Sequence, residues 1–140
     1  MTETTKTPTV LFVCSKNGGK SQLAAGLMNH LADGSVTVHS AGTKPGQSLN
    51  PQCADSLAEL GIDITGEYPK PVTDEIRDAA DVVIVLGNQA KVEPREGQRL
   101  EFWDTDEPSE RGIEGMERMR LVRDDIMARV RKLHAELAGN

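Results

Sequence analysis

Short apolar segments alternate with longer segments of helical periodicity along most of this chain. The first apolar segment, residues 9–13, is continuous rather than alternating, as in a strand that is covered on both faces. After a glycine-rich stretch, leucines recur at helical spacing from Leu23 to Leu31, until Asp33 and Gly34 end the helix. This alternation predicts an α/β fold in which right-handed crossovers build a parallel sheet and helices cover both faces.

The rest of the sequence continues the same alternation. The longest periodic segment comes last, where apolar residues recur every three or four positions from Met116 to Leu137 and charged residues fill the other face. Further strands are expected at 36–39, 81–86 and 99–103, a turn at 40–43, and further helices at 73–80 and, after an Asn50 cap and Pro51, at 52–60. We therefore expect a single three-layer domain over residues 9–140 with a four-stranded parallel sheet, preceded by a flexible lead at 1–8.

The composition disfavours several classes of function. The 140 residues carry a formal charge of −6, which argues against binding to nucleic acid or to an anionic membrane surface. No apolar run approaches the roughly 20 residues of a membrane-spanning helix, and the polar N-terminal stretch does not resemble a signal peptide, so a cytoplasmic protein is expected. The two cysteines, Cys14 and Cys53, are too few for a disulfide framework or a zinc cluster, and neither a metal site nor a bound cofactor is expected.

Residues 14–21 have the features of an anion-binding loop. A glycine-rich turn between a strand and a helix can direct successive backbone N–H groups inward, and the N-terminus of the helix adds its dipole. Gly18 and Gly19 permit the turn, and Asn17 is one of the few residue types that tolerate a positive φ. The residues expected to surround a bound oxyanion are Ser15, Lys16, Asn17, Gly18, Gly19 and Lys20.

Three side chains of this loop carry the expected chemistry. The field of the helix favours the reactive thiolate form of Cys14, Lys20 can place its positive charge on a bound dianion, and Ser21 can donate a hydrogen bond to the sulfur. Taken singly, each has a structural interpretation as a buried cysteine, a solvated lysine or a helix-capping serine. Their order between a strand and a helix is specific, however, and predicts nucleophilic attack on a tetrahedral oxyanion.

The loop resembles that of the low-molecular-weight tyrosine phosphatase family, whose signature is Cys, five residues, Arg and then Ser or Thr, with Asn at the position of Asn17. The similarity continues through residues 40–43 and several later segments, and so extends over most of the chain. The resemblance implies that Cys14 is the nucleophile, that Asn17 shapes the loop and that Ser21 orients the thiolate.

Departures from the phosphatase signature favour the arsenate reductase branch of the family. Lys20 replaces the family arginine and lacks the planar fork that grips two oxygens of a phosphoryl transition state. The small or polar Ser15 and Lys16 beside the nucleophile fit an inorganic oxyanion better than a phosphotyrosine ring. The segment from Asn17 to Ser21 is also similar to the loop of that branch, whose members bind arsenate because it mimics phosphate.

The resemblance also bears on the source of electrons. Thioredoxin-coupled reductases of that branch carry two further cysteines just after the third strand, whereas residues 86–89 here read Leu, Gly, Asn and Gln, which excludes an internal relay at that position. Cys53, inside a predicted helix, is interpreted as a small buried hydrophobe rather than a resolving thiol. An external thiol is therefore implied, as in the actinobacterial arsenate-mycothiol transferases, in which mycothiol captures the arsenic and a mycoredoxin-type reductase releases arsenite.

An acidic segment follows the last predicted strand, where the family carries an Asp-Pro general acid. Alignment on Pro108 favours Glu107 in this role, Asp106 and Asp104 stay open as alternatives, and a solvated acidic turn is the structural interpretation. His39 is interpreted as structural rather than as a general base, because a thiolate stabilised by the loop needs no separate base.

Three functions are compatible with these features. The favoured one is activation of arsenate by Cys14 and its transfer to an external thiol. The others are a weak phosphatase with the same fold and an oxyanion-binding module without turnover, although carboxylates beside Pro108 would not help such a module to bind a dianion. The sequence leaves open whether the protein is a monomer or a homodimer.

Overall fold

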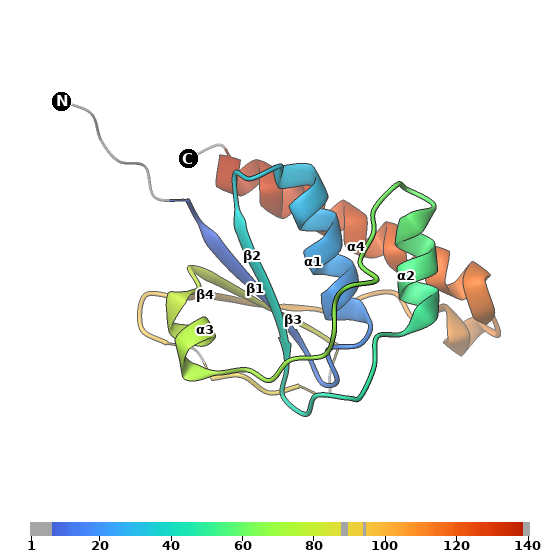
Figure 1. Cartoon of the computed structure of the whole chain (residues 1–140), viewed down its shortest axis with the longest axis horizontal. Coiled ribbons are helices and arrows are strands. Elements are labelled where there is room, and N and C mark those ends of the chain that lie inside the picture. The colour runs from blue at the N-terminus through green and yellow to red at the C-terminus, as the bar shows by residue number, and fades with distance from the viewer. Residues whose placement is uncertain (1–6, 88–89, 94, 139–140) are drawn as a thin grey trace.

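A computed structural model of the chain describes residues 7–87, 90–93 and 95–138. Residues 1–6 of the expected lead, and Asn88 and Gln89 of the segment without cysteine, lie outside this description. The elements, in chain order, are β1 (Thr9–Cys14), α1 (Lys20–Ala32), β2 (Thr37–Gly42), α2 (Pro51–Ala58), α3 (Asp74–Ala79), β3 (Val82–Leu86), β4 (Arg99–Trp103), the 3-10 turn η1 (Pro108–Arg111) and α4 (Gly115–Ala138) (Figure 1).

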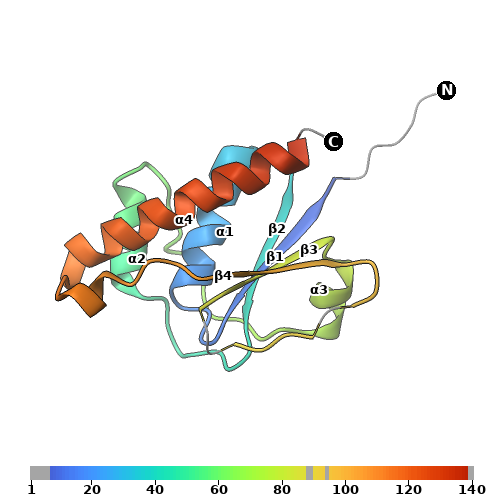
Figure 2. The ribbon, with the colours of Figure 1, turned by 180° about the vertical axis from the view of Figure 1, so that it is seen from behind.

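The described strands form one parallel sheet of order β2-β1-β3-β4. Helices α1, α2 and α4 cover one face of this sheet and α3 covers the other, as the two opposite views show (Figures 1 and 2). The predicted α/β class, with a four-stranded parallel sheet between helices, is confirmed.

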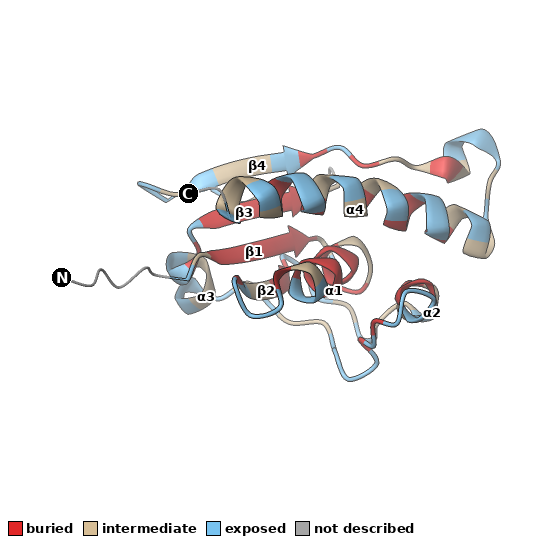
Figure 3. Cartoon of the chain, turned by 90° about the horizontal axis from the view of Figure 1, so that it is seen from above, coloured by how far each residue is buried: buried red, intermediate tan, exposed pale blue. Residues whose placement is uncertain are grey.

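The alternation of side chains along β1 explains why both faces need a cover. Val10 and Phe12 belong to the larger core under α1, α2 and α4, whereas Leu11 and Val13 belong to the smaller core under α3. All four are fully buried, as expected for a central strand of a parallel sheet. Figure 3 shows the same contrast between the buried strands β1 and β3 and the partly exposed edge strand β4.

One predicted boundary was wrong in a way that matters for the site. Residues 40–42 were expected in a turn, but β2 continues through them and pairs with β1 as far as Cys14 opposite Gly42. Gly42 also bridges to Pro71, so it has backbone neighbours on both sides. The turn was predicted from small residues with weak strand preference, and pairing with β1 overrides that preference.

The other boundaries differ by one or two residues. Helix α2 begins as predicted, because the Asn50 side chain accepts a hydrogen bond from the Gln52 N–H at 2.8 Å, but it ends at Ala58 rather than at residue 60. The turn η1, which starts at Pro108, was not predicted.

The strand order reverses at β1, which lies between β2 and β3. In open parallel sheets, ligands bind beyond the carboxyl ends of the strands at such a reversal. Cys14 is the last residue of β1 and so stands at this point. In the described part of the chain, no helix has the length and apolar character that crossing a membrane requires.

Candidate active site

The loop between β1 and α1 has its carbonyl groups bonded to a neighbouring segment. Four hydrogen bonds of 2.7 to 3.2 Å run from the N–H groups of Thr43, Lys44, Gly46 and Asn50 to the carbonyls of Cys14, Ser15, Lys16 and Gly18. The N–H and C=O of one planar peptide point in opposite directions, so the amide that follows each of these carbonyls points to the inner side of the loop. The loop therefore offers the inward-facing amides of an anion-binding nest.

The Cys14 sulfur lies at the base of this nest. It accepts a hydrogen bond from the Asn17 N–H at 3.2 Å and lies 2.8 Å from the Ser21 hydroxyl oxygen. That oxygen already accepts a hydrogen bond from Asn17 Nδ2 at 2.7 Å, which leaves the Ser21 proton to be donated to the sulfur. The structure thus brings Cys14, Asn17 and Ser21 together as the sequence predicted, with Cys14 only 8% exposed.

Asn17 adopts the left-handed conformation expected of it, with φ of +54°. Its side-chain oxygen accepts hydrogen bonds from the Lys70 N–H at 2.9 Å and from Gln22 Nε2 at 3.2 Å, and Gln22 Nε2 also donates to the Asn17 carbonyl at 3.1 Å. Gln22, which is 1% exposed, therefore holds the strained residue of the loop in place. Sequence reasoning missed Gln22, because a single polar residue in the first turn of a helix carries no periodic signal.

Gly42 packs directly against the loop. A Cβ atom at this position would lie 2.7 Å from the Ser15 carbonyl oxygen and 3.0 Å from the Asn17 nitrogen, both backbone atoms. Only a residue without a side chain allows the backbones to approach so closely. The unexpected continuation of β2 to Gly42 is thus what supports the loop from its outer side.

Three lysines surround the cavity that contains Cys14. This open cavity has a volume of about 910 Å³ and is lined by the loop, by residues 44–51 and by the end of β3. Lys16, Lys20 and Lys44 all contribute to its lining. A chain with a net charge of −6 therefore has a local cluster of positive charge where an oxyanion would bind. Lys44 was not singled out from the sequence.

Glu107 is a charged counter-ion in this structure. Arg118 makes two hydrogen bonds to it, from Nε to Oε2 at 2.6 Å and from Nη2 to Oε1 at 2.7 Å, and the Ser109 hydroxyl donates to Oε2 at 2.8 Å. These donors, Arg118 above all, lower the pKa of Glu107 to about 2. A carboxyl group with that pKa holds no proton at neutral pH and is poorly suited to act as a general acid.

The other two acidic candidates have different surroundings. Asp106 forms a bidentate ion pair with Arg111, at 2.7 and 3.0 Å, and this hydrogen-bonded partner lowers the pKa of Asp106 as well. Asp104 is exposed, and its carbonyl accepts a hydrogen bond from Arg129. Among the described residues that line the Cys14 cavity, none comes from the segment 104–107.

Cys53 lies behind the loop and not in the cavity. Cys53 is 1% exposed, and its thiol donates to the Met119 sulfur at 3.6 Å. It lies beside Gly19 of the loop, since a Cβ built on Gly19 would be 3.8 Å from the Cys53 sulfur. Burial raises the pKa of Cys53 to about 12, so the thiol stays protonated and unreactive.

This difference predicts selective alkylation. Iodoacetamide at neutral pH should modify one thiol of the native protein, at Cys14, and two thiols of the protein unfolded in guanidinium, as counted by mass spectrometry after digestion. Phosphate or arsenate should slow the reaction of Cys14 without affecting any labelling of Cys53. Equal labelling of both cysteines in the native protein would contradict the buried position of Cys53.

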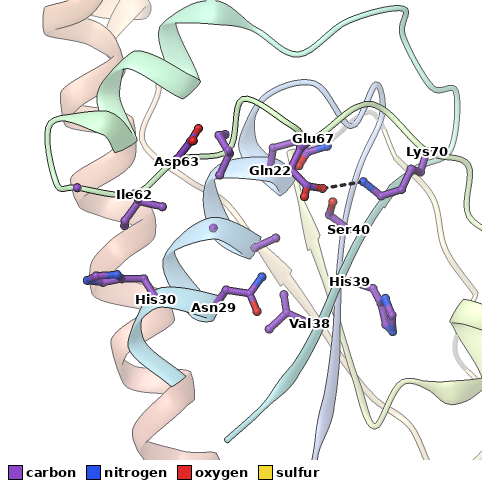
Figure 4. Close-up of a pocket in the computed structure, with 14 residues that line it drawn as sticks. Gln22, Asn29, His30, Val38, His39, Ser40, Ile62, Asp63, Glu67 and Lys70 are labelled. Atoms are coloured by element: carbon purple, nitrogen blue, oxygen red, sulfur yellow. Dashed lines mark hydrogen bonds and ion pairs between the residues drawn. The ribbon is translucent and has the colours of Figure 1, made fainter. Parts of the chain in front are cut away.

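His39 lines a different cavity from Cys14. This second cavity, about 480 Å³ in volume, lies between α1, β2 and the segment 61–70 (Figure 4). In Figure 4, His39 projects from β2 on the same side as Lys70, while His30 lies on α1. The placement of His39 outside the Cys14 cavity agrees with its interpretation as a residue that is not the general base.

The family of the chain follows from comparison with known proteins. Residues 9–140 match the family described as low molecular weight phosphotyrosine protein phosphatase, and the chain belongs to this family. Its similar relatives place it on the arsenate reductase branch. One is the glutaredoxin arsenate reductase of Synechocystis sp., 31% identical over 132 residues that cover 92% of this chain and 98% of the relative. Another is an arsenate reductase of Bacillus licheniformis, 32% identical over 89% of this chain and 93% of the relative.

Solved structures agree with this placement. A structure described as an arsenate reductase in the phosphate binding state matches with a TM-score of 0.80 and 32% identity, and the match covers 93% of this chain and 98% of the other. The thioredoxin-dependent arsenate reductase Cg_ArsC1' of Corynebacterium glutamicum matches with a TM-score of 0.78 and 32% identity. That match covers 94% of this chain but 61% of the Corynebacterium chain.

Proposed function

We propose that this protein is an arsenate reductase that activates arsenate at Cys14 and passes the arsenic to an external thiol. The observation that carries the proposal is the Cys14 sulfur at the base of an amide-lined loop, 2.8 Å from the Ser21 hydroxyl. A dianion bound there is placed next to a nucleophilic sulfur that is oriented by the Ser21 hydroxyl and the Asn17 N–H.

The first step forms a bond between the Cys14 sulfur and arsenic. Hydrogen arsenate binds to the loop amides and to Lys20, the thiolate attacks the arsenic, and one arsenic–oxygen bond breaks. The departing oxygen, which carries one proton in hydrogen arsenate, takes up a second proton from solvent and leaves as water. A leaving group that already carries a proton from hydrogen arsenate does not depend on a protonated Glu107, which agrees with the low pKa of that residue.

The second and third steps use thiols from outside the chain. The external thiol attacks the arsenic and forms a new sulfur–arsenic bond, while Cys14 leaves as the thiolate. A thiol of a separate reductase then attacks the sulfur of that conjugate, and the electron pair of the sulfur–arsenic bond reduces As(V) to arsenite. The products are a mixed disulfide and a regenerated Cys14.

The proposal of an external thiol rests on the cysteine content of the chain and on the cavity. The sequence has two cysteines, and Cys53 is buried with a raised pKa. The cavity beside Cys14, at about 910 Å³, is far larger than one tetrahedral oxyanion and continues along residues 44–51. This space is available to a second substrate while the oxyanion is bound.

We propose mycothiol as that thiol and a mycoredoxin-type protein as the reductase. The support is the resemblance to arsenate-mycothiol transferases together with the missing relay. Two of the relatives named above are a glutaredoxin arsenate reductase and a thioredoxin-dependent arsenate reductase, so protein reductants are the alternatives that an experiment must separate.

The test is arsenite production by the purified protein with three reductant systems in parallel. Mycothiol with mycoredoxin is expected to support turnover, whereas thioredoxin or glutaredoxin with its own reductase is expected to support little. Turnover with a protein reductant alone would replace mycothiol in the proposal, and no turnover with any system would refute the reductase function itself.

Phosphatase activity is the second candidate function, since the family is described as a phosphatase family. Lys20→Arg restores the planar fork of the family signature, and we expect it to raise the hydrolysis of p-nitrophenyl phosphate by about tenfold, or about 1.4 kcal/mol of barrier. The exposed Lys132→Arg, on α4, provides a control for the exchange itself. If Lys20→Arg hydrolyses the ester no faster than the wild type, the lysine does not account for weak phosphatase activity.

A further inference from the structure

Lys20 has an acidic neighbour that comes from another part of the chain. Its ammonium nitrogen lies 3.8 Å from Glu107 Oε1, and both side chains are about one-quarter exposed, at 24% and 27%. Glu107 precedes η1 and is separated from Lys20 by most of the sequence. A lysine has a flexible stem and no fork, so it needs a neighbour to fix its direction.

Glu107 is itself held rigidly. Its Oε2 atom accepts hydrogen bonds from Arg118 Nε, the Ser109 hydroxyl and the Ser109 N–H, and its Oε1 atom accepts one from Arg118 Nη2. The bidentate geometry of Arg118 fixes the plane of the carboxylate. Oε1 is the atom that lies next to Lys20, so the direction of Lys20 depends on Arg118 through Glu107.

Arg118 also lies against the back of the loop. Together with Gly19, Lys20 and Cys53, it lines a small cavity of about 70 Å³ between α1, α2 and α4. Among the described residues, Lys20 and Arg118 are the cations paired with Glu107. Arg118 therefore neutralises the carboxylate, and the charge of Lys20 stays available for an oxyanion.

From these contacts we propose that Arg118 and Glu107 form a positioning pair, which directs the Lys20 ammonium toward the bound oxyanion. The pair replaces the rigidity that an arginine fork would give at position 20. This inference rests on the proposed function, because it assigns the pair to the arsenate site. It also assigns Glu107 to charge placement instead of proton transfer.

The proposal predicts a distinct effect for each member of the pair. In Arg118→Gln, Glu107 loses its main partner and draws the Lys20 ammonium closer than its present 3.8 Å and away from the oxyanion, so the affinity for the oxyanion should fall about tenfold. In Glu107→Gln, Lys20 loses its guide but also its competitor, and turnover should fall by about tenfold at most. A general acid at Glu107 would instead predict a loss of about 100-fold or more with a changed alkaline limb of the pH profile.

Oxyanion affinity can be measured without turnover, as the arsenate concentration that halves the rate of Cys14 alkylation by iodoacetamide. Arg120→Gln is the matched control, because Arg120 lies on the same helix and makes a comparable bidentate pair with Glu59, away from Lys20. Arg118→Lys keeps the charge and should recover part of the affinity. Thermal unfolding of each variant shows whether the fold is retained.

A tenfold weaker protection in Arg118→Gln, with no change in Arg120→Gln and partial recovery in Arg118→Lys, supports the positioning pair. Equal protection in Arg118→Gln and Arg120→Gln overturns it, and so does a loss of 100-fold or more in the turnover of Glu107→Gln. If arsenate fails to protect Cys14 even in the wild type, the proposed function itself is refuted. If arsenate protects the wild type and Arg118→Gln equally well, the positioning pair alone is refuted.

Discussion

Cys14→Ser is expected to abolish thiol-dependent arsenite production, with a loss of about three orders of magnitude or more. The serine hydroxyl is nearly the same size as the thiol and can keep the contacts with Ser21 and Asn17, so the loop should stay folded. It is not ionised at neutral pH and cannot form the sulfur–arsenic bond. The measurement is the initial rate of arsenite release with mycothiol and mycoredoxin at saturating arsenate.

Cys53→Ala is the matched control for this variant. Loss of the buried sulfur and its contact with Met119 should cost about 1 kcal/mol of stability, but turnover should stay within about threefold of the wild type. Turnover that disappears in Cys53→Ala while its fold is retained would make Cys53 a resolving thiol. Substantial arsenite release by Cys14→Ser would mean that the loop does not supply the nucleophile.

Gly42→Ala is expected to have the second largest effect. A Cβ atom 2.7 Å from the Ser15 carbonyl oxygen and 3.0 Å from the Asn17 nitrogen forces β2 and the loop apart, because neither contact involves a flexible side chain. We expect a loss of about 1–3 kcal/mol in the free energy of unfolding. Arsenate turnover should fall more than tenfold, since small displacements of reacting groups carry large costs.

Gly66→Ala separates this clash from a general effect of replacing glycine. Apart from its two chain neighbours, no described residue has an atom within 4 Å of a Cβ at position 66, so the change should leave both turnover and unfolding unaltered. Denaturant unfolding and arsenite release are measured on both variants. If Gly42→Ala behaves like Gly66→Ala, the outer support of the loop is not needed for its geometry.

Local patterns were sufficient to predict most of the fold. The continuous apolar run of β1 reflects a strand that is buried on both faces, and the periodicity of α4 reflects a helix that is buried on one face. Both patterns are visible in the sequence. The end of β2 was mispredicted because residues 40–42 have no strong strand preference of their own. They are in a strand because β1 pairs with them, and this pairing depends on residues far away in the sequence.

In the candidate site, too, contacts within one short segment could be predicted and contacts between distant segments could not. Cys14, Asn17 and Ser21 lie within one short loop, so their spacing alone predicted that they meet. The partners of Glu107 could not be predicted, because Arg118 reaches it from α4 across the turn η1, which had no recognised signal. The sequence predicted a general acid in this segment, and its arginine partners, which lower the pKa values of Glu107 and Asp106, became visible only in the structure.

The most direct test of transfer to an external thiol is to stop the reaction before the reductase acts. The protein is incubated with arsenate and mycothiol in the absence of mycoredoxin, and the products are analysed by mass spectrometry. The account predicts a mycothiol–arsenic conjugate, no arsenite, and a chain with both cysteines reduced. Arsenite released together with a disulfide between Cys14 and Cys53 would show an internal relay and would contradict the account.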